Sequence, residues 1–279
     1  MHFALSSQNF GTYGDPLLLA ELASDAEAAG WDGFFVWDHL LRGDAPVADP
    51  WISLAAVAIA TERLRIGTMV TPLSRRRPWQ VARQATTLDH LSNGRVTLGV
   101  GLGSSPRMEF EPFAEETDDR RRAEILDESL DIVTRLWSGE TFDREGAYTL
   151  RGVRSLPPPL QRPRIPIWVA GNWPNRGPLR RAARYEGVFP QKVPEDPDDW
   201  MLTPEEVRSI VTVIDEHRSS GAPFDVAVAL SDEGDRVRRA DMVEEHADAG
   251  VTWWMEGVLD DVGPLEEVRT LIRNGPRSG

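Results

Sequence analysis

Short apolar runs alternate with longer amphipathic stretches along almost the whole chain. The apolar runs have the length and composition of buried strands, and each is followed by a helical repeat of apolar positions. Strands that alternate with helices in this way are parallel and are covered by helices on both faces of the sheet. The pattern predicts strands at residues 2–7, 33–37, 64–70, 95–100, 165–170, 187–191, 224–230 and 251–255, and helices at residues 16–29, 51–61, 78–91, 118–137, 179–185, 204–219, 235–249 and 264–272.

Eight strand–helix units within 279 residues fit an α/β barrel, which needs about 250 residues. We therefore predict a single domain over residues 1–279, built as an eight-stranded (βα)8 barrel; the alternative is an open, doubly wound sheet. The alternation is interrupted once, at residues 141–160. That segment predicts a small insertion, a hairpin with a proline-rich connection, between the fourth helix and the fifth strand.

Composition excludes several classes of function. A formal charge of −14 disfavours binding to nucleic acid or to an anionic membrane surface. No run of 18 apolar residues and no secretory signal is seen, and cysteine is absent, so a cytoplasmic location is expected. The histidines lack metal-binding spacing, so no metal site is predicted. The expected partner is a small-molecule substrate, and the default oligomer is a homodimer.

The strand at residues 33–37 ends directly at Asp38 and His39. In a (βα)8 barrel the carboxyl ends of the strands meet at one mouth, where catalytic groups are found. Histidine suits proton transfer near neutral pH, and the same pair of groups could hydrogen-bond a cofactor; a structural loop histidine is the alternative. The other residues predicted at the mouth are Gln8, Asn9, Val70, Thr71, 101–104, Gly171, Asn172, Gln191, Ser231 and Glu256.

Two glycine-containing segments also reach this mouth. Gly101 and Gly103 follow the fourth strand, but a loop follows them, so they do not form a dinucleotide-binding fingerprint. We expect these glycines to let a flat ring approach the backbone closely, with tight barrel packing as the alternative for Gly99. Gly171 and Asn172 precede a helix whose free N–H groups could bind phosphate. The alternative is an ordinary helix start with Asn172 as its cap.

Two runs of arginine stand out in this acidic chain. The run 75–77 follows the third strand and could hold an anionic tail at the mouth, although such runs usually form a solvated surface. The run 120–122 opens a helix, and we expect it to lie on the surface.

Several of these segments together resemble the bacterial luciferase-like superfamily. They are WDHLL at residues 37–41, the long block from Asp49 to Gly103, PIWVAGNWP at 166–174 and ARYEGVFPQ at 183–191. The resemblance implies an eight-stranded barrel that uses a reduced flavin, either FMN or the deazaflavin coenzyme F420. An Asp-His pair after the second strand, here Asp38 and His39, is frequent in the F420 branch, so F420 is favoured. The resemblance also implies a non-proline cis peptide within residues 68–71, where Val70 and Thr71 would back the ring.

The function implied is an F420-dependent oxidoreductase that transfers hydride to or from a small organic substrate. Asp38 and His39 would bind the cofactor or relay a proton, and Glu109, in the loop after the fourth strand, is a further acid–base candidate. Gly101, Gly103, Gly171, Asn172, Arg75 and Arg76 complete the expected cofactor site, with the arginines meeting its polyglutamate tail. The alternatives are an FMN-dependent monooxygenase and a flavin- or deazaflavin-binding protein without turnover. The short segments around the mouth predict a small substrate lid.

Overall fold

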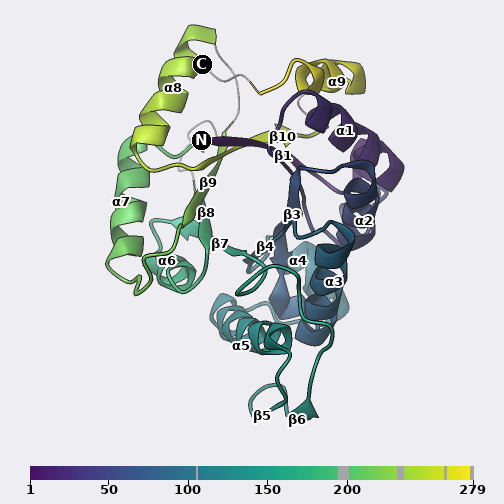
Figure 1. Ribbon diagram of the computed structural model, residues 1–279, viewed down its shortest axis with the longest axis vertical. Coiled ribbons are helices and arrows are strands. Elements are labelled where there is room, and N and C mark those ends of the chain that lie inside the picture. The colour runs from purple at the N-terminus through teal and green to yellow at the C-terminus, as the bar shows by residue number, and fades with distance from the viewer. Residues whose placement is uncertain (105, 194–200, 231–235, 261–262, 277–279) are drawn as a thin grey trace.

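The computed structural model describes residues 1–104, 106–193, 201–230, 236–260 and 263–276. Eight parallel strands form a closed barrel in the order β1-β10-β9-β8-β7-β4-β3-β2, so the predicted (βα)8 barrel is confirmed. Figure 1 shows these strands around a central axis, with the helices outside them. The strands are β1 (His2–Ser7), β2 (Gly33–Val36), β3 (Arg65–Pro72), β4 (Val96–Gly101), β7 (Ile167–Trp173), β8 (Gly187–Lys192), β9 (Asp225–Leu230) and β10 (Trp253–Val258).

The helices of the barrel begin at residues that the sequence marks clearly. Asp15 and Asp49 cap α1 and α2, each accepting a hydrogen bond from the backbone N–H two residues later at 2.9 Å, and a proline occupies the first turn of both helices. The helices are α1 (Pro16–Ala28), α2 (Pro50–Ala60), α3 (Pro78–Leu91), α5 (Asp119–Ser138), α6 (Arg176–Ala182), α7 (Pro204–Asp215), α8 (Arg236–Asp248) and α9 (Leu265–Arg273).

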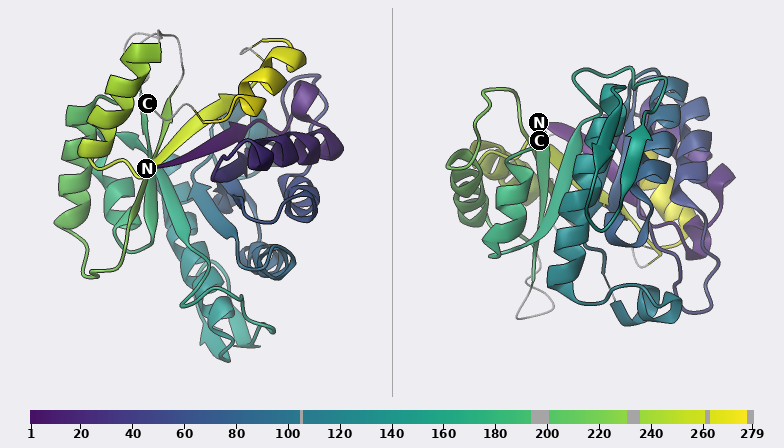
Figure 2. Two further views of the ribbon diagram at one scale, coloured as in Figure 1. Left: turned by 45° about the horizontal axis from the view of Figure 1, so that its top comes forward. Right: turned by 90° about the horizontal axis from the view of Figure 1, so that it is seen from below.

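Short elements occupy the connections. The loop after β4 contains α4 (Pro106–Glu109) and the 3₁₀ turn η3 (Glu111–Phe113), while η1 (Gly11–Tyr13) and η2 (Leu73–Arg75) follow β1 and β3. The expected hairpin lies within residues 141–160, as β5 (Phe142–Arg144) and β6 (Leu150–Val153). It projects from the barrel beside α5 (Figures 1 and 2). Tyr148 of the hairpin contacts Trp79 edge-on at 5.5 Å between ring centroids, which ties it to the start of α3.

The interior of the barrel is filled by large side chains over most of its depth. Phe35 stacks on Trp168 at 5.3 Å, and the indole N–H groups of Trp168 and Trp253 donate to Asp225 at 3.1 and 3.2 Å. This packing closes the amino-terminal end of the barrel. The inner cluster comprises Ala4, Phe35, Met69, Trp168, Phe189, Ala227, Trp253 and Met255.

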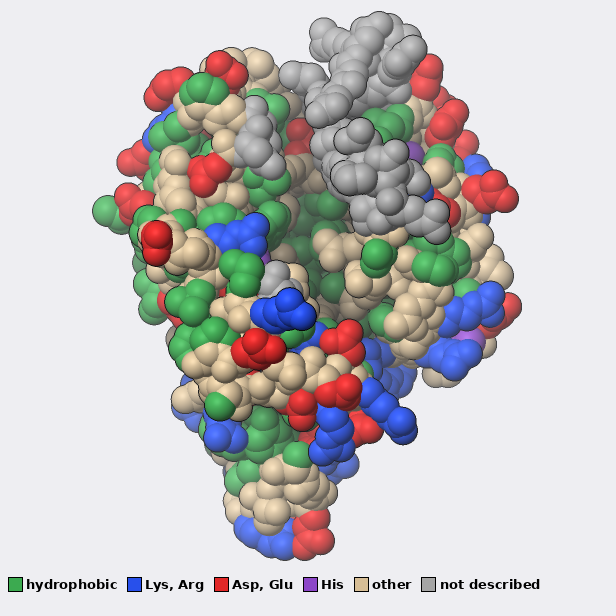
Figure 3. Space-filling model, turned by 180° about the vertical axis from the view of Figure 1, so that it is seen from behind, with side chains coloured by type: hydrophobic (Ala, Val, Ile, Leu, Met, Phe, Trp, Pro, Cys, Tyr) green, Lys and Arg blue, Asp and Glu red, His purple; other side chains and the backbone are tan. Residues whose placement is uncertain are grey.

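Small residues occupy the last inward-facing positions of several strands. Side chains alternate between the two faces of a strand, so the residue two positions beyond an interior residue also faces inward. This rule places small residues above the aromatic layer, and Figure 3 shows that this face is hollowed at its centre. The mouth is therefore an open depression above a filled barrel. The small residues are Ser6, Gly101, Ala170, Ala229 and Gly257.

The end of β3 departs from regular geometry. The register between β3 and β4 shifts between Thr68 and Thr71, and the Met69–Val70 peptide bond is cis. The non-proline cis peptide expected within residues 68–71 is thus confirmed. None of the helices that the structure describes is long and apolar enough to cross a membrane.

Candidate active site

Asp38 and His39 leave β2 at the mouth of the barrel, where a buried asparagine fixes their backbone. Asn9, which follows β1, donates through Nδ2 to the carbonyl oxygens of His39 and Ala48 at 2.9 and 2.8 Å. Its Oδ1 accepts a hydrogen bond from the His39 N–H at 3.1 Å. Because one side chain satisfies three backbone groups, the turn after β2 has a single defined path.

Asp38 is enclosed by protein. Its carboxylate accepts hydrogen bonds from Thr71 Oγ1 at 2.9 Å and Arg76 Nη2 at 2.6 Å, and Arg75 Nη2 lies 3.4 Å away. The side chain has no exposed surface. Two guanidinium groups and a hydroxyl therefore occupy its oxygens, and the role of Asp38 in binding the cofactor or relaying a proton stays a prediction. Thr71 is also fully buried, and its hydroxyl faces Asp38 rather than the mouth.

Glu109 reaches the same region from α4 and meets His39. Its Oε2 lies 3.1 Å from His39 Nδ1 and 3.2 Å from Arg75 Nη1, and its Oε1 accepts the Leu40 N–H at 2.7 Å. Burial alone would raise the pKa of Glu109. The hydrogen bond from His39, the charges of Arg75 and His39, and the Leu40 N–H outweigh burial and lower that pKa to about 2. Glu109 is thus a carboxylate at neutral pH.

The carboxylate of Glu109 determines how His39 carries its proton. An ionised carboxylate can only accept hydrogen bonds, so His39 Nδ1 must carry the hydrogen and Nε2 is left as an acceptor in the neutral ring. No partner for Nε2 occurs among the described residues. The ring packs against Phe10 and Trp37, with centroid distances of 5.4 and 5.8 Å, and Trp37 is fixed by a hydrogen bond from Nε1 to Ser6 Oγ at 3.0 Å. The site therefore presents one oriented proton acceptor.

The three consecutive arginines have three different environments. Arg75 is buried between Asp38 and Glu109, with 1% of its side chain exposed, so it cannot meet an external tail. Arg76 is 15% exposed and pairs with Asp38. Arg77 is exposed and lies over the rings of Trp79 and Tyr148. The guanidinium of Arg75 balances two internal carboxylates, and cofactor binding by Arg75 stays a prediction.

The glycines and Val70 at the ends of β3 and β4 have packing roles. A Cβ atom on Gly101 would lie 2.8 Å from Val70 Cγ2, and one on Gly103 would lie 2.9 Å from Pro72 Cβ. Gly103 also has a positive φ of +81°. A larger side chain at either position would therefore collide with β3, and the approach of a flat ring to these glycines stays a prediction. Val70 packs on the inner cluster of the barrel and remains partly exposed at the mouth.

Gly171 and Asn172 belong to β7, which extends to Trp173. A Cβ atom on Gly171 would lie 2.1 Å from Pro178 Cβ, so this glycine lets α6 pack closely on the strand. Asn172 is exposed. The cap of α6 is Asn175, which accepts the Gly177 N–H at 3.0 Å, and the alternative that Asn172 caps the helix is wrong.

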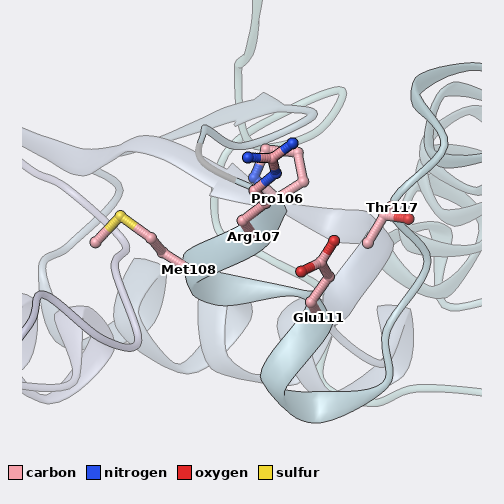
Figure 4. Close-up of a pocket in the computed structure, with 5 residues that line it drawn as sticks. All are labelled: Pro106, Arg107, Met108, Glu111 and Thr117. Atoms are coloured by element: carbon pink, nitrogen blue, oxygen red, sulfur yellow. The ribbon is translucent and has the colours of Figure 1, made fainter.

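The other residues predicted at the mouth are less informative. Gln191 is exposed at the end of β8, Gln8 donates to Asp260 at 2.6 Å, and Glu256 is buried. Ser231 lies outside the described residues. Within the described part of the chain, no cluster of three or more His, Asp or Glu residues could hold a metal ion. A shallow pocket lined by Pro106, Arg107, Met108, Glu111 and Thr117 lies on the loop after β4 (Figure 4) and includes none of the residues around His39.

Comparison with known proteins supports the resemblance seen in the sequence. The chain is 38% identical over 159 residues to the F420-dependent glucose-6-phosphate dehydrogenase of Beutenbergia cavernae, covering 54% of the chain and 45% of that protein. It is 38% identical over 120 residues to the 4-hydroxyprotoasukamycin monooxygenase of Streptomyces nodosus subsp. asukaensis, covering 43% of the chain and 32% of that protein. The chain thus matches half or less of the length of these curated relatives.

A solved structure shares the fold over the full chain. It is an F420-dependent secondary alcohol dehydrogenase in complex with an F420–acetone adduct, with a TM-score of 0.80, 16% sequence identity and coverage of 100% of this chain and 99% of that one. The model of the luciferase-like monooxygenase family matches residues 1–232. The chain therefore belongs to the luciferase-like monooxygenase family.

Proposed function

We propose that this protein is an F420-dependent oxidoreductase that transfers hydride between the deazaflavin and a small organic substrate. The observation that carries the proposal is the His39–Glu109 pair, which leaves one oriented proton acceptor at the open mouth of the barrel. Relatives named as F420-dependent dehydrogenases support this choice of cofactor. Hydride transfer between an alcohol and a ketone requires a proton acceptor for the hydroxyl group, and the pair supplies one.

The shape of the mouth fits a planar ring. The last inward-facing residues of β1, β4, β9 and β10 are small, as is Ala170 of β7, and the layer below them is aromatic and filled. A flat group can therefore rest across the barrel without displacing core side chains, with Val70 beneath one of its faces. F420, when bound there, would supply the hydride acceptor or donor.

The residues of this chain provide the proton transfer and its orientation. His39 Nε2 would accept the proton of a substrate hydroxyl, or return it in the reverse direction. Glu109 remains ionised and stabilises the imidazolium that forms, because its carboxylate lies 3.1 Å from Nδ1. Arg75 holds Glu109 from the other side, and Asp38 neutralises Arg75 and Arg76.

The remainder of the cofactor would extend over the ends of β7 and β3. We assign the phosphate to the end of β7 at Gly171 and Asn172, of which Asn172 is exposed. Arg77 is exposed and is the member of the arginine run that can meet an anionic tail without losing a carboxylate partner. Arg76, at 15% exposure, would have to leave Asp38 to do so.

An FMN-dependent monooxygenase is the second candidate, and a specific observation favours it. The relative from Streptomyces nodosus subsp. asukaensis is named a monooxygenase and is as similar in identity as the dehydrogenase from Beutenbergia cavernae. The mouth would accept the isoalloxazine ring as well as the deazaflavin ring. A cofactor-binding protein without turnover is disfavoured, because the ionised Glu109 and the tautomer of His39 form an arrangement suited to proton transfer.

Titration of the protein with each cofactor tests the proposal. Cofactor binding should quench the fluorescence of Trp37, which lies at the mouth beside His39. We expect F420 to bind more tightly than FMN. Oxidation of a panel of alcohols is then followed through the absorbance of F420. Tighter binding of FMN with oxygen consumption would contradict the F420 proposal and favour the monooxygenase.

A substitution tests the role of His39. His39→Ala should weaken F420 binding or slow its reduction at least about tenfold, equivalent to about 1.4 kcal/mol. His217→Ala, at an exposed position at the end of α7, is the matched control and should change neither. Unchanged affinity and rate in His39→Ala would return this histidine to a structural role.

Two further proposals concern the whole protein. We propose that it forms a homodimer, on the basis of an exposed apolar face of the uncharged helix α2, with Ile52 and Ile59, in a chain of charge −14. The substrate is expected to be a small molecule, as predicted from composition. The cytoplasmic location and the absence of nucleic-acid binding stay predictions.

A further inference from the structure

A second buried arginine lies behind Glu109, in the first turns of α5. Arg122 is only 2% exposed, although it follows two arginines whose side chains are 90% and 62% exposed. Those neighbours, Arg120 and Arg121, pair with Glu124 on the helix surface. The expectation that the whole run 120–122 lies on the surface is therefore wrong for Arg122. Its guanidinium group points inward from the helix.

The contacts of Arg122 join the start, middle and end of one loop. Nη1 donates to the carbonyl oxygens of Leu102 and Gly103 at 2.7 and 3.4 Å, where the chain leaves β4. The guanidinium carbon lies 4.6 Å from the centroid of the Phe110 ring. Nη2 donates to Asp119 at 2.6 Å, where α5 begins. The loop between these points carries α4 and Glu109.

Two guanidinium groups lie over the ring of Phe110. Arg122 lies over its ring at 4.6 Å, and Arg75, the partner of Glu109, lies 5.5 Å from the same ring centroid. The ring has no exposed surface and lies against Gly103, where a Cβ atom would approach it to 3.2 Å. Cation–π contacts are strongest in a desolvated site such as this one. Phe110 directly follows Glu109 in the chain, so fixing the ring of Phe110 also fixes the backbone from which the Glu109 side chain extends.

We propose that Arg122 is a positioning residue that holds Phe110 and the α4 loop so that Glu109 stays in contact with His39. The proposal rests on the proposed function of the His39–Glu109 pair. Arg122 touches neither member of that pair and acts through Phe110. The buried Nε of Arg122 has no hydrogen-bond partner, and an unpaired buried donor costs free energy. Stabilisation of α5 alone does not explain why the Arg122 side chain is buried at this cost. The contacts that offset this cost all lie on the loop or at the helix start that follows it.

Removal of the Arg122 guanidinium tests the proposal without any cofactor or substrate. In Arg122→Met, Glu109 should lose its fixed contact with His39 and with Arg75, so its pKa rises by about 1 or more from about 2. Carboxyl ¹³C NMR measures this pKa, and imidazole ¹⁵N NMR reports whether His39 still carries its proton on Nδ1. Arg121→Met, one residue earlier and exposed, is the matched control and should change neither measurement.

Two more variants keep the proposal testable if Arg122→Met folds poorly. Arg122→Lys keeps a cation and a donor but loses the planar group, and it should give an intermediate pKa for Glu109. Phe110→Leu keeps an apolar side chain without the ring face, and it should raise the pKa of Glu109 as Arg122→Met does. In the double variant the two effects should not add, since both act through one contact.

Kinetics separate this proposal from the proposed function. If F420 turnover is found, Arg122→Met should lower kcat about tenfold with little change in KM, because the loss concerns an oriented group rather than substrate binding. If the NMR changes occur and no F420 turnover exists, the positioning role stands and the proposed function fails. An unchanged Glu109 pKa and His39 tautomer in folded Arg122→Met and Phe110→Leu would overturn the positioning role.

Discussion

The ionised carboxylate of Glu109 contributes to the free energy of unfolding near neutral pH, and this contribution is lost in acid. Its pKa is about 2 in the folded protein, below the ordinary value of 4.5. A carboxyl group with a lowered pKa stabilises the fold above the unfolded value and loses this contribution as the pH falls toward the folded value. The stability of the wild type should therefore fall by about 2 kcal/mol between pH 7 and pH 3 on account of Glu109 alone.

Glu109→Gln removes this proton equilibrium and keeps the size of the side chain. Urea unfolding at pH 7 and pH 3 measures both proteins, and the difference between them isolates Glu109 from the other carboxylates. The wild type should lose more stability than the variant over this interval. Equal losses would show that Glu109 has an ordinary pKa in the folded state and is not held by Arg75 and His39.

The sequence placed His39 at the carboxyl end of a strand, where the structure has it, but could not assign the partners of its charged neighbours. The end of a buried strand placed Asp38 and His39 at the mouth, and the loop after the fourth strand suggested Glu109. The role of Asp38 depends on Arg75 and Arg76, whose side chains leave the η2 turn in directions that composition does not reveal. Three consecutive arginines have the same chemistry, yet they are buried, half-buried and exposed in turn.

A helical repeat could have identified Arg122. The buried face of α5 includes Leu126, Ser129, Leu130 and Val133, and Arg122 lies on this face at the position one turn before Leu126. A charged residue at the apolar repeat of a helix predicts an internal partner. The partner itself, Phe110, could not be foreseen, because the path of the loop after β4 has no periodic pattern.

At the scale of elements, the close contact between α6 and β7 depends on Gly171. A Cβ atom there would lie 2.1 Å from Pro178 Cβ and 2.7 Å from Pro178 Cγ, and the rigid proline ring cannot turn away. Gly171→Ala should therefore displace α6 and destabilise the protein by about 1–3 kcal/mol. Gly221→Ala is the matched control, since a Cβ atom at that glycine has open space around it. Thermal unfolding compares the two, and equal melting temperatures would refute this role of Gly171.

Element starts were predicted better than element ends. The starts of α1, α3 and α7 coincide with the predicted ones because a proline in the first turn acts locally. In α1 and α7 a capping side chain before the proline, Asp15 or Thr203, adds to this signal. The predicted helix at 204–219 ends at Asp215, because residues 216 and 217 are exposed and add no buried contact. For α6, the residue that marks the start of the helix is Asn175 and not the predicted Asn172.

At the scale of the whole molecule, the closed barrel follows from the regular alternation of apolar strands and amphipathic helices. The alternation does not reveal how the interior is filled. An aromatic layer below and small residues above, as in Ser6, Ala170 and Ala229, are set by which residues face each other across the barrel, and that register needs the structure. The open mouth therefore could be expected from the fold class, whereas the small residues that line it could not.

The proposed homodimer is tested at α2. This helix has no charged residue, and Ile52 and Ile59, seven positions apart on one face, are 65% and 75% exposed. Two copies of a chain of charge −14 repel each other least where such a face meets its symmetry mate. Figure 1 places α7 across the barrel from α2, so the exposed Ser209 of α7 provides the control position.

Sedimentation equilibrium should give the wild type about twice the chain mass of 31.1 kDa. The double substitution Ile52→Glu and Ile59→Glu places carboxylates on both sides of the two-fold contact, and since neither side chain is buried within the chain, it should give a folded monomer. Ser209→Glu adds the same charge elsewhere and should leave the dimer intact. A monomeric wild type, or a dimer that survives the double substitution, would show that α2 is not the contact between two copies.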